Sequence, residues 1–333
     1  MMTDSPLGPP PLEPNPAAKR NSVMQILIAD DSATSRRVLE ATLQNWGYEV
    51  VAVEDGSAAW EILKKDRSPQ LAILDWVMPG FSGPEVCRLV RGLARPRYTY
   101  ILLLTSKNQK ADIIEGMEAG ADDYVVKPFD SNELKVRLGP GRRILELQGE
   151  LLETQAALHE QATRDALTHL WNRRAILEIL NRELARSLRE ESPLGIVLGD
   201  VDRFKSINDE FGHIVGDTVL RKVGVQMAAS VRHYDAVGRY GGEEFLIVLP
   251  GCDLAASQRL AERVRVATEQ IPESVLGIDR NVTMSFGLTA QIPHSGTNLE
   301  LLLKTADEAL YQAKEQGRNR VVARLISNPG TAG

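Results

Sequence analysis

The sequence predicts two domains, the first of α/β class and the second of α+β class, joined by a helical linker. In residues 23–138, five short apolar runs alternate with five helical patterns, which is the order of a doubly wound parallel sheet. In residues 164–325, two apolar runs flank a Gly-Gly pair, as in a tight β-hairpin. The linker is expected in residues 139–163, and a chain of 333 residues is long enough for two separate cores.

The composition is that of an ordinary globular protein and argues against several classes of function. Charged residues make up 25% and hydrophobic residues 43%, with a net charge of −6, so we expect no general nucleic-acid-binding surface. Two distant cysteines, Cys87 and Cys252, provide no disulfide framework and suit a reducing cytoplasm. No apolar run is long enough to span a bilayer, so we expect a cytoplasmic protein without membrane contact. The Pro-rich residues 1–22 are expected to be a disordered tail, and residues 326–333 a second tail.

The elements of the first domain follow from apolar runs separated by turn signals. The expected strands are residues 26–28, 50–53, 71–74, 100–104 and 123–126. The expected helices are residues 35–46, 57–64, 84–93, 110–119 and 131–138. Because ligands bind at the carboxyl ends of the strands in such a sheet, we expect the functional site at that edge.

Polar residues follow four of these strands at the edge where the site is expected. Asp30 and Asp31 follow the first strand, Asp75 the third, Thr105 the fourth and Lys127 the fifth. Three crowded carboxylates repel one another and are stable mainly around a divalent cation such as Mg²⁺. An aspartate beside such a cation can accept a phosphoryl group, whose oxygens the lysine and the threonine would then contact. Taken singly, the residues are also explained as a helix N-cap, a turn residue and a solvated lysine.

Four motifs, ILIADDS, LDWVMPG, LLLTS and GADDYVVKPF, cover essentially all of this domain. They resemble the receiver domain of bacterial response regulators. The resemblance implies that Asp75 is the phosphoacceptor and that an upstream histidine kinase is a partner. It also implies a Mg²⁺ site on four positions: Asp30 through water, and Asp31, Asp75 and the carbonyl of Val77 directly. The other implied functional positions are the switch pair Thr105 and Tyr124 and the phosphate-contacting Lys127.

The linker combines a helix-breaking sequence with an apolar stripe. Gly139, Pro140 and Gly141 are expected to break or bend the helix, and residues 142–163 to form a new amphipathic helix. Apolar residues recur in that helix at a/d-type spacing, at Ile144, Leu147, Leu151 and Leu158, with Thr154 at the intervening position. The stripe favours the stalk of a homodimer, although a helix that packs on its own domain also explains it.

The second domain places carboxylates after a predicted strand and within a predicted hairpin. Asp200 and Asp202 follow the apolar run LGIVL, and Glu243 and Glu244 follow the Gly-Gly turn. If the strand and the hairpin are neighbours, Asp200 and Glu243, with the carbonyl of Val201, can hold a pair of Mg²⁺ or Mn²⁺ ions that clamp a triphosphate. A pair of solvated aspartates and an acidic turn are the simpler alternatives.

Five motifs of this domain, DALTHLWNRR, DVDRFKSIND, FGHIVGD, RYGGEEF and YQAKEQGRN, resemble the GGDEF family of diguanylate cyclases. The resemblance implies a ferredoxin-like fold of the cyclase and polymerase-palm type. It implies GTP as the substrate and a homodimer in which two GTP-loaded domains face each other. The two nucleotides would then be joined into cyclic di-GMP with loss of two pyrophosphates.

The resemblance to this family also implies roles for individual residues. Asp200, Glu243 and the carbonyl of Val201 would coordinate the metal ions, and Glu244 would help to activate the attacking 3′-hydroxyl. The implied guanine-reading positions are Asn208 and Asp217, and the implied phosphate contacts are Phe204, Lys205, Lys314 and Arg318.

Arg232 and Asp235 lie at the spacing from the GGEEF motif at which many members of the family carry an inhibitory site. The resemblance therefore implies cyclic di-GMP as an inhibitor as well as the product. An arginine can contact a guanine edge or a phosphate with two hydrogen bonds. Arg259 and Arg263, four residues apart on one helical face, are candidates for the partner surface. Solvated arginines explain the same pattern.

The two acidic sites together predict a phosphorylation-regulated diguanylate cyclase. A catalytically silent receptor that binds cyclic di-GMP through Arg232 and Asp235 is one alternative, and a phosphorylation-controlled scaffold that acts through protein contacts is another. The presence of Asp200, Glu243 and Glu244 favours the enzyme over the silent receptor.

Overall fold

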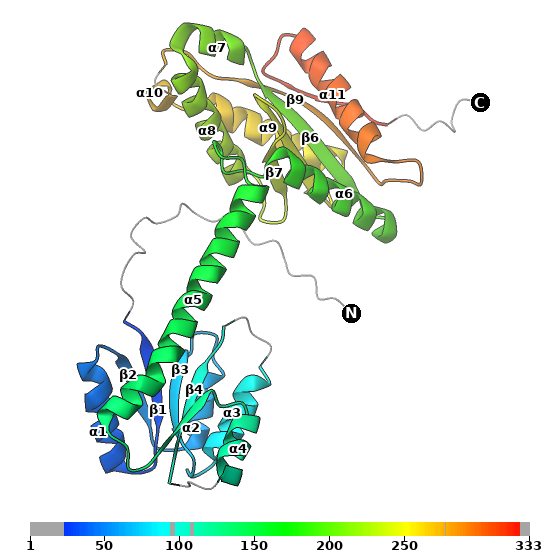
Figure 1. Cartoon of the computed structure of the whole chain (residues 1–333). Helices are drawn as coiled ribbons and strands as arrows, with labels where there is room; N and C mark the ends of the chain where they lie inside the picture. The colour runs from blue at the N-terminus through cyan, green and yellow to red at the C-terminus, as the bar shows by residue number, and fades with distance from the viewer. Residues whose placement is uncertain (1–22, 94–96, 107–109, 277, 327–333) are drawn as a thin grey trace. The chain divides into compact units, whose positions relative to one another are not determined.

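The computed structural model describes residues 23–93, 97–106, 110–276 and 278–326 (Figure 1). The two expected tails lie outside these residues, apart from Ile326. The chain divides into two compact units between Ala156 and Ala157. Within the described residues, no helix combines the length and the apolar character needed to cross a membrane.

The first unit is a five-stranded parallel sheet with helices packed on it, as predicted (Figure 1). Its strands are β1 (Gln25–Ala29), β2 (Glu49–Val53), β3 (Leu71–Asp75), β4 (Tyr100–Thr105) and β5 (Asp123–Val126). Their order in the sheet is β2-β1-β3-β4-β5. The helices are α1 (Ala33–Asn45), α2 (Gly56–Leu63), α3 (Gly83–Arg91), α4 (Lys110–Glu118) and part of α5 (Ser131–Thr163).

The central strands are buried on both faces, which explains their nearly continuous apolar sequences. Successive residues of β1 serve different cores: Leu27 packs in one cluster of buried residues, and Ile26 and Ile28 pack in another. The side chain of Ser32 accepts a hydrogen bond from the N–H of Ser35 and so caps α1. The strand therefore ends and the helix begins within a few residues, and the acidic pair after β1 lies at that junction.

The expected break at residues 139–141, with a new helix from residue 142, is wrong, because α5 continues from Ser131 to Thr163 with Pro140 inside it. Proline contributes no N–H to the helical ladder, which is why a break or a bend was expected. Packing on both sides of the proline outweighs this loss. The residues that bury α5 against the first unit are Leu134, Leu138 and Leu145.

The glycines beside Pro140 have different surroundings. A Cβ atom on Gly141 would lie 2.5 Å from the ring of Tyr100, whereas one on Gly139 would meet nothing within 4 Å. Gly141 thus allows the helix backbone to lie directly against Tyr100, whose hydroxyl donates a hydrogen bond to the carbonyl of Arg137 at 3.3 Å. The glycine that looked like a helix breaker is a site of close packing.

The second unit is a five-stranded sheet in the order β10-β9-β6-β8-β7. Its strands are β6 (Leu194–Val201), β7 (Ala236–Arg239), β8 (Glu244–Pro250), β9 (Met284–Gln291) and β10 (Val321–Ala323). Its helices are α6 (Arg173–Glu190), α7 (Phe204–Phe211), α8 (His213–Ser230), α9 (Leu254–Glu269), α10 (Glu273–Leu276) and α11 (Leu299–Glu315). The antiparallel order β9-β6-β8-β7, with helices between β6 and β7 and between β8 and β9, is the predicted ferredoxin-like arrangement. β10 adds a strand parallel to β9.

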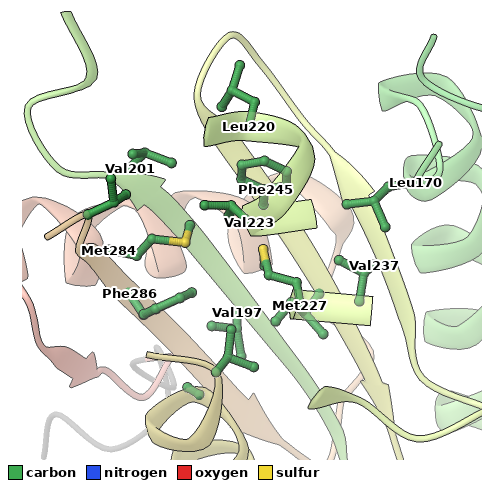
Figure 2. Close-up of a cluster of buried hydrophobic side chains, with 14 of the residues drawn as sticks. Leu170, Val197, Val201, Leu220, Val223, Met227, Val237, Phe245, Met284 and Phe286 are labelled. Atoms are coloured by element: carbon green, nitrogen blue, oxygen red, sulfur yellow. The ribbon is translucent and has the colours of Figure 1, made fainter. Parts of the chain in front are cut away.

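Both faces of this sheet are covered. Figure 2 shows Val197, Phe245 and Phe286 of the sheet beside Val223 and Met227 of α8, all members of one buried cluster. A second cluster joins the other face of β6 and β8 to α6 and α11. With both faces packed, polar chemistry is concentrated at the end of β6 and at the β7–β8 hairpin.

Candidate functional sites

In the first unit, three carboxylates meet at the carboxyl ends of β1 and β3. One oxygen from each of Asp30, Asp31 and Asp75 lies within 4.8 Å of the others. Asp30 is buried, and its carboxylate accepts hydrogen bonds from the Ser32 N–H at 2.8 Å and the Ser35 hydroxyl at 2.7 Å. This set of hard oxygen ligands fits a divalent cation such as Mg²⁺.

Lys127 joins this cluster from the end of β5. Its Nζ lies 2.8 Å from Oδ2 of Asp30 and 2.7 Å from Oδ2 of Asp75. Burial raises the pKa of Asp75 above its usual value, and Asp30 adds to the rise, although Lys127 opposes it. Partial burial works against the charge on Lys127, but its bonds to the two aspartates outweigh this and raise its pKa. The lysine therefore stays charged where the oxygens of a phosphoryl group on Asp75 would lie.

The other positions of the first site lie around this cluster. Thr105 is buried at the end of β4, and Tyr124 lies on the adjacent β5, where the Arg137 guanidinium is 5.9 Å from the centre of its ring. Val77 follows β3 with an exposed side chain. The sheet thus places the switch candidates on neighbouring strands, and their movement on phosphorylation stays a prediction.

In the second unit, β6 and the β7–β8 hairpin bring the predicted metal ligands together. Asp200 pairs with Glu244 across β6 and β8, and the Val201 N–H donates a hydrogen bond to the carbonyl of Glu243 at 3.2 Å. A Cβ atom on Gly241 would lie 2.6 Å from Oε2 of Glu244, so the turn folds closely over this carboxylate. The alternative of two solvated aspartates is wrong, since Asp200 and Asp202 are each only 7% exposed.

Lys314 contributes a positive charge to this acidic site from α11. Its Nζ lies 2.8 Å from Oδ2 of Asp200. Burial raises the pKa of Asp200, Lys314 opposes the rise, and the charges of Glu243 and Glu244 add to it. An acidic group whose ionisation is opposed by burial and by two further carboxylates gains from a bound divalent cation, so these residues also fit Mg²⁺.

Asn208 carries an unsatisfied polar atom beside α8. Its Oδ1 is buried and has no hydrogen-bond partner within the described residues, which is uncommon for a buried polar atom. Gly216 makes room for it, because a Cβ atom there would lie 1.9 Å from this oxygen. Asp217 is the next residue of α8 and is exposed.

The residues expected to contact phosphate comprise one buried side chain and several cations. The side chain of Phe204 belongs to the hydrophobic core, so only its backbone is left to contact a ligand. Lys205 and Arg318 are exposed, and Arg318 adopts a left-handed φ of 64° directly after Gly317. Together with Lys314, they place three cations near the first turn of α7 and the end of α11.

Asp202 has a structural role that the sequence did not reveal. Its carboxylate accepts hydrogen bonds from the Thr283 hydroxyl at 2.7 Å, the Ser285 hydroxyl at 2.6 Å and the Asn319 N–H at 3.1 Å. The donors come from Thr283 just before β9, from Ser285 in β9 and from Asn319 in the turn after α11, far away in sequence. No local pattern could have identified them.

A second unanticipated network supports the hairpin turn. Arg239 donates two hydrogen bonds to the carbonyl of Gly242, at 3.0 and 2.7 Å, and pairs with Asp165 at 3.2 Å. Burial raises the pKa of Asp165, but hydrogen bonds from Thr168 and the attraction of Arg239 outweigh it and hold the pKa below its usual value. Gly242, the residue before Glu243 and Glu244, is therefore linked through Arg239 to the segment that precedes α6.

Of the candidate residues for the inhibitory site, Arg232 and Arg263 interact with Asp235. The Arg232 N–H donates to Oδ2 of Asp235 at 2.8 Å, while Oδ1 of Asp235 is buried without a partner among the described residues. Burial raises the pKa of Asp235, and Arg232 and Arg263 oppose the rise. Arg263 is held by the carbonyl of Ser230 at 2.6 Å, and Arg259 lies exposed one turn earlier on α9.

Comparison with known proteins agrees with the two sites. Residues 26–139 match the family described as response regulator receiver domain, and residues 162–320 match the family described as diguanylate cyclase, GGDEF domain. The chain belongs to the response regulators that carry a GGDEF domain, as its motifs predicted.

Three relatives illustrate the match. Response regulator PleD of Caulobacter vibrioides is 33% identical over 90% of this chain, which spans 66% of that protein. Diguanylate cyclase DosC of Escherichia coli is 41% identical over 54% of this chain and 38% of its own length. A crystal structure of the coiled coil and GGDEF domain of DgcB from Caulobacter crescentus, in complex with c-di-GMP, aligns with a TM-score of 0.50 at 29% identity, covering 57% of this chain and 99% of that one.

Proposed function

We propose that this protein is a diguanylate cyclase that condenses two GTP molecules into cyclic di-GMP and two pyrophosphates. The observation that carries the proposal is the convergence of Asp200, the backbone of Val201 and Glu243 at one end of β6. The proposal is supported by the family of the domain and by the name of DosC.

Each protomer would prepare one GTP. Asn208 and Asp217 would bind the guanine edge, and Lys205, Lys314 and Arg318 would bind the phosphates. Mg²⁺ held by Asp200, Glu243 and the Val201 carbonyl would neutralise the phosphate oxygens and favour ionisation of the 3′-hydroxyl. These roles rest on the positions of the side chains described above.

The reaction itself forms one P–O bond for each one that breaks. Glu244 would orient the 3′-hydroxyl of one GTP and receive its proton. The freed oxygen attacks the α-phosphorus of the GTP on the partner protomer, and pyrophosphate leaves. A second, symmetric transfer closes the ring. Because each site holds one nucleotide, the reaction requires a homodimer.

Phosphorylation of Asp75 by a histidine kinase would control this dimer. Lys127, already within 2.7 Å of Asp75, would contact the phosphoryl oxygens, and Thr105 and Tyr124 would switch position. The exposed stripe of α5 would pair with its copy in the partner; its members are Ile144, Leu147, Leu151 and Leu158. Arg232, Asp235 and Arg263 would bind cyclic di-GMP as a feedback inhibitor, and we place the protein in the cytoplasm.

The test is product formation from GTP and Mg²⁺, with and without beryllofluoride as an acyl-phosphate mimic. We expect cyclic di-GMP from the wild type, a change in rate with beryllofluoride, and no such change in Asp75→Asn. Binding of cyclic di-GMP without any synthesis, under both conditions, would overturn the cyclase and favour a silent receptor.

A further inference from the structure

Asp30, one of the three carboxylates of the first unit's site, is fully buried and shares one of its oxygens between two donors. Its Oδ2 accepts a hydrogen bond from Nζ of Lys127 at 2.8 Å and another from the hydroxyl of Ser35 at 2.7 Å. Its Oδ1 accepts one from the Ser32 N–H at 2.8 Å. Lys127 was expected at this site from the sequence, whereas Ser35 was not.

The two donors to Oδ2 come from different elements. Ser35 lies in the first turn of α1, directly after Asp30 in the chain. The same turn also holds the backbone of Asp30, because Nη1 of Arg36 donates a hydrogen bond to the Asp30 carbonyl at 2.5 Å. Lys127 follows β5 and divides its N–H groups between Asp30 and Asp75. Local structure therefore fixes Ser35 to Asp30, whereas Lys127 is also bound to the predicted phosphoacceptor.

A phosphoryl group on Asp75 would compete with Asp30 for the same lysine. Such a group adds negative charge and strong acceptor oxygens, so it attracts the N–H groups of Lys127. When Lys127 turns to these oxygens, Oδ2 of Asp30 loses one of its two donors. Within the residues that the structure describes, the donor that remains is the Ser35 hydroxyl. A buried carboxylate oxygen that kept no donor at all would destabilise the site.

We propose that Ser35 is a positioning residue of the phosphorylation site, whose hydroxyl keeps Asp30 paired while Lys127 contacts the phosphoryl group. This role rests on the proposed phosphorylation of Asp75. Without the hydroxyl, Lys127 would be the remaining described donor to Oδ2, and it could reach the phosphoryl group only by leaving a buried carboxylate oxygen unpaired. Ser35 thus acts through Asp30, and it favours the movement of the lysine.

The test is calorimetric titration of the full chain with beryllofluoride as the phosphoryl mimic, without nucleotide and with Mg²⁺ in fixed excess. Ser35→Ala removes the hydroxyl, so the affinity for beryllofluoride should fall roughly 5- to 150-fold, the factor that corresponds to one buried acceptor left unpaired. Ser35→Thr keeps a hydroxyl on the same carbon and should retain most of the affinity. Ser35→Val has nearly the shape of threonine but no hydroxyl, and it should bind as weakly as Ser35→Ala.

Two controls separate this role from a general effect on α1. Thr34 is the exposed neighbour of Ser35 in the same turn, so Thr34→Ala removes a hydroxyl there and should bind beryllofluoride as the wild type does. Denaturant titration of Ser35→Ala without beryllofluoride measures its free energy of unfolding. A purely structural role would lower this free energy and leave the affinity for beryllofluoride unchanged.

The outcomes distinguish the role of Ser35 from the phosphorylation on which it rests. Wild-type affinity in Ser35→Ala, or equal affinities of the threonine and valine variants, would overturn the role of Ser35 and leave phosphorylation of Asp75 standing. If the wild type does not bind beryllofluoride, or if Asp75→Asn binds it equally well, phosphorylation at Asp75 is refuted and the role of Ser35 with it. None of these titrations depends on the synthesis of cyclic di-GMP.

Discussion

Replacement of Gly216 by alanine tests the proposed guanine site separately from the proposed metal site. Gly216 lies in the first turn of α8, and an added Cβ atom would lie 1.9 Å from Oδ1 of Asn208. Contacts that short do not occur, so the amide must move away. The change leaves Asp200 and Glu243 as they are, because neither is among the near neighbours of that Cβ atom.

The size of the effect follows from what the amide contributes. An Asn side chain that reads a base edge with two hydrogen bonds contributes about 1–3 kcal/mol, which corresponds to roughly a 5- to 150-fold change in affinity. Gly216→Ala should therefore raise the KM for GTP by a factor in this range, with a smaller effect on kcat. Steady-state synthesis of cyclic di-GMP over a range of GTP concentrations measures both constants.

A double substitution controls for general damage to α8. If the methyl group acts by displacing the amide, Gly216→Ala should have little further effect once Asn208→Ala has removed the amide. Fully additive losses, or a KM for Gly216→Ala equal to that of the wild type, would refute the assignment of Asn208.

Three further changes test other parts of the structure. Gly141→Ala should destabilise the first unit by about 1–3 kcal/mol, because the added methyl group overpacks against the ring of a tyrosine on β4. Gly139→Ala meets no neighbour and should stabilise α5 by about 0.5–1 kcal/mol. Denaturant titrations of both variants measure the two effects, and equal changes in the free energy of unfolding would contradict this account of the packing. The pKa of Asp165 is held below 3.8 in the folded protein, so its stabilising contribution is complete above pH 3.8 and is lost as the pH falls through the lowered value. Asp165→Asn should therefore reduce the loss of unfolding free energy at acid pH. An unchanged dependence of stability on pH would argue against the ion pair of Asp165 with Arg239. Leu151→Lys should weaken dimerisation roughly tenfold or more, because it replaces a leucine of the exposed stripe on α5. Sedimentation velocity would detect this loss, and Glu150→Lys at the neighbouring exposed position is the control.

The sequence predicted the features that depend on short-range pattern. The apolar runs predicted every strand of the first unit because a strand buried on both faces leaves little choice of residue. The acidic residues at Asp30, Asp75 and Asp200 were correctly placed at strand ends, since a residue that follows a buried strand must emerge at the edge of the sheet.

Features that depend on distant contacts could not be predicted. The helix through Pro140 survives because a tyrosine on β4 and three leucines of α5 hold it, and none of these is a local signal. The partners of Asp202 lie at the start of β9, in the residue before it and after α11.

The most direct measurement of the central claim is the amount of cyclic di-GMP that the purified chain makes from GTP and Mg²⁺, compared with its Glu243→Gln variant. If Asp200, Val201 and Glu243 form the metal site that drives the transfer, the wild type makes cyclic di-GMP, and removal of this one charge abolishes synthesis while the protein stays folded. Synthesis by the variant at the wild-type rate would contradict the account.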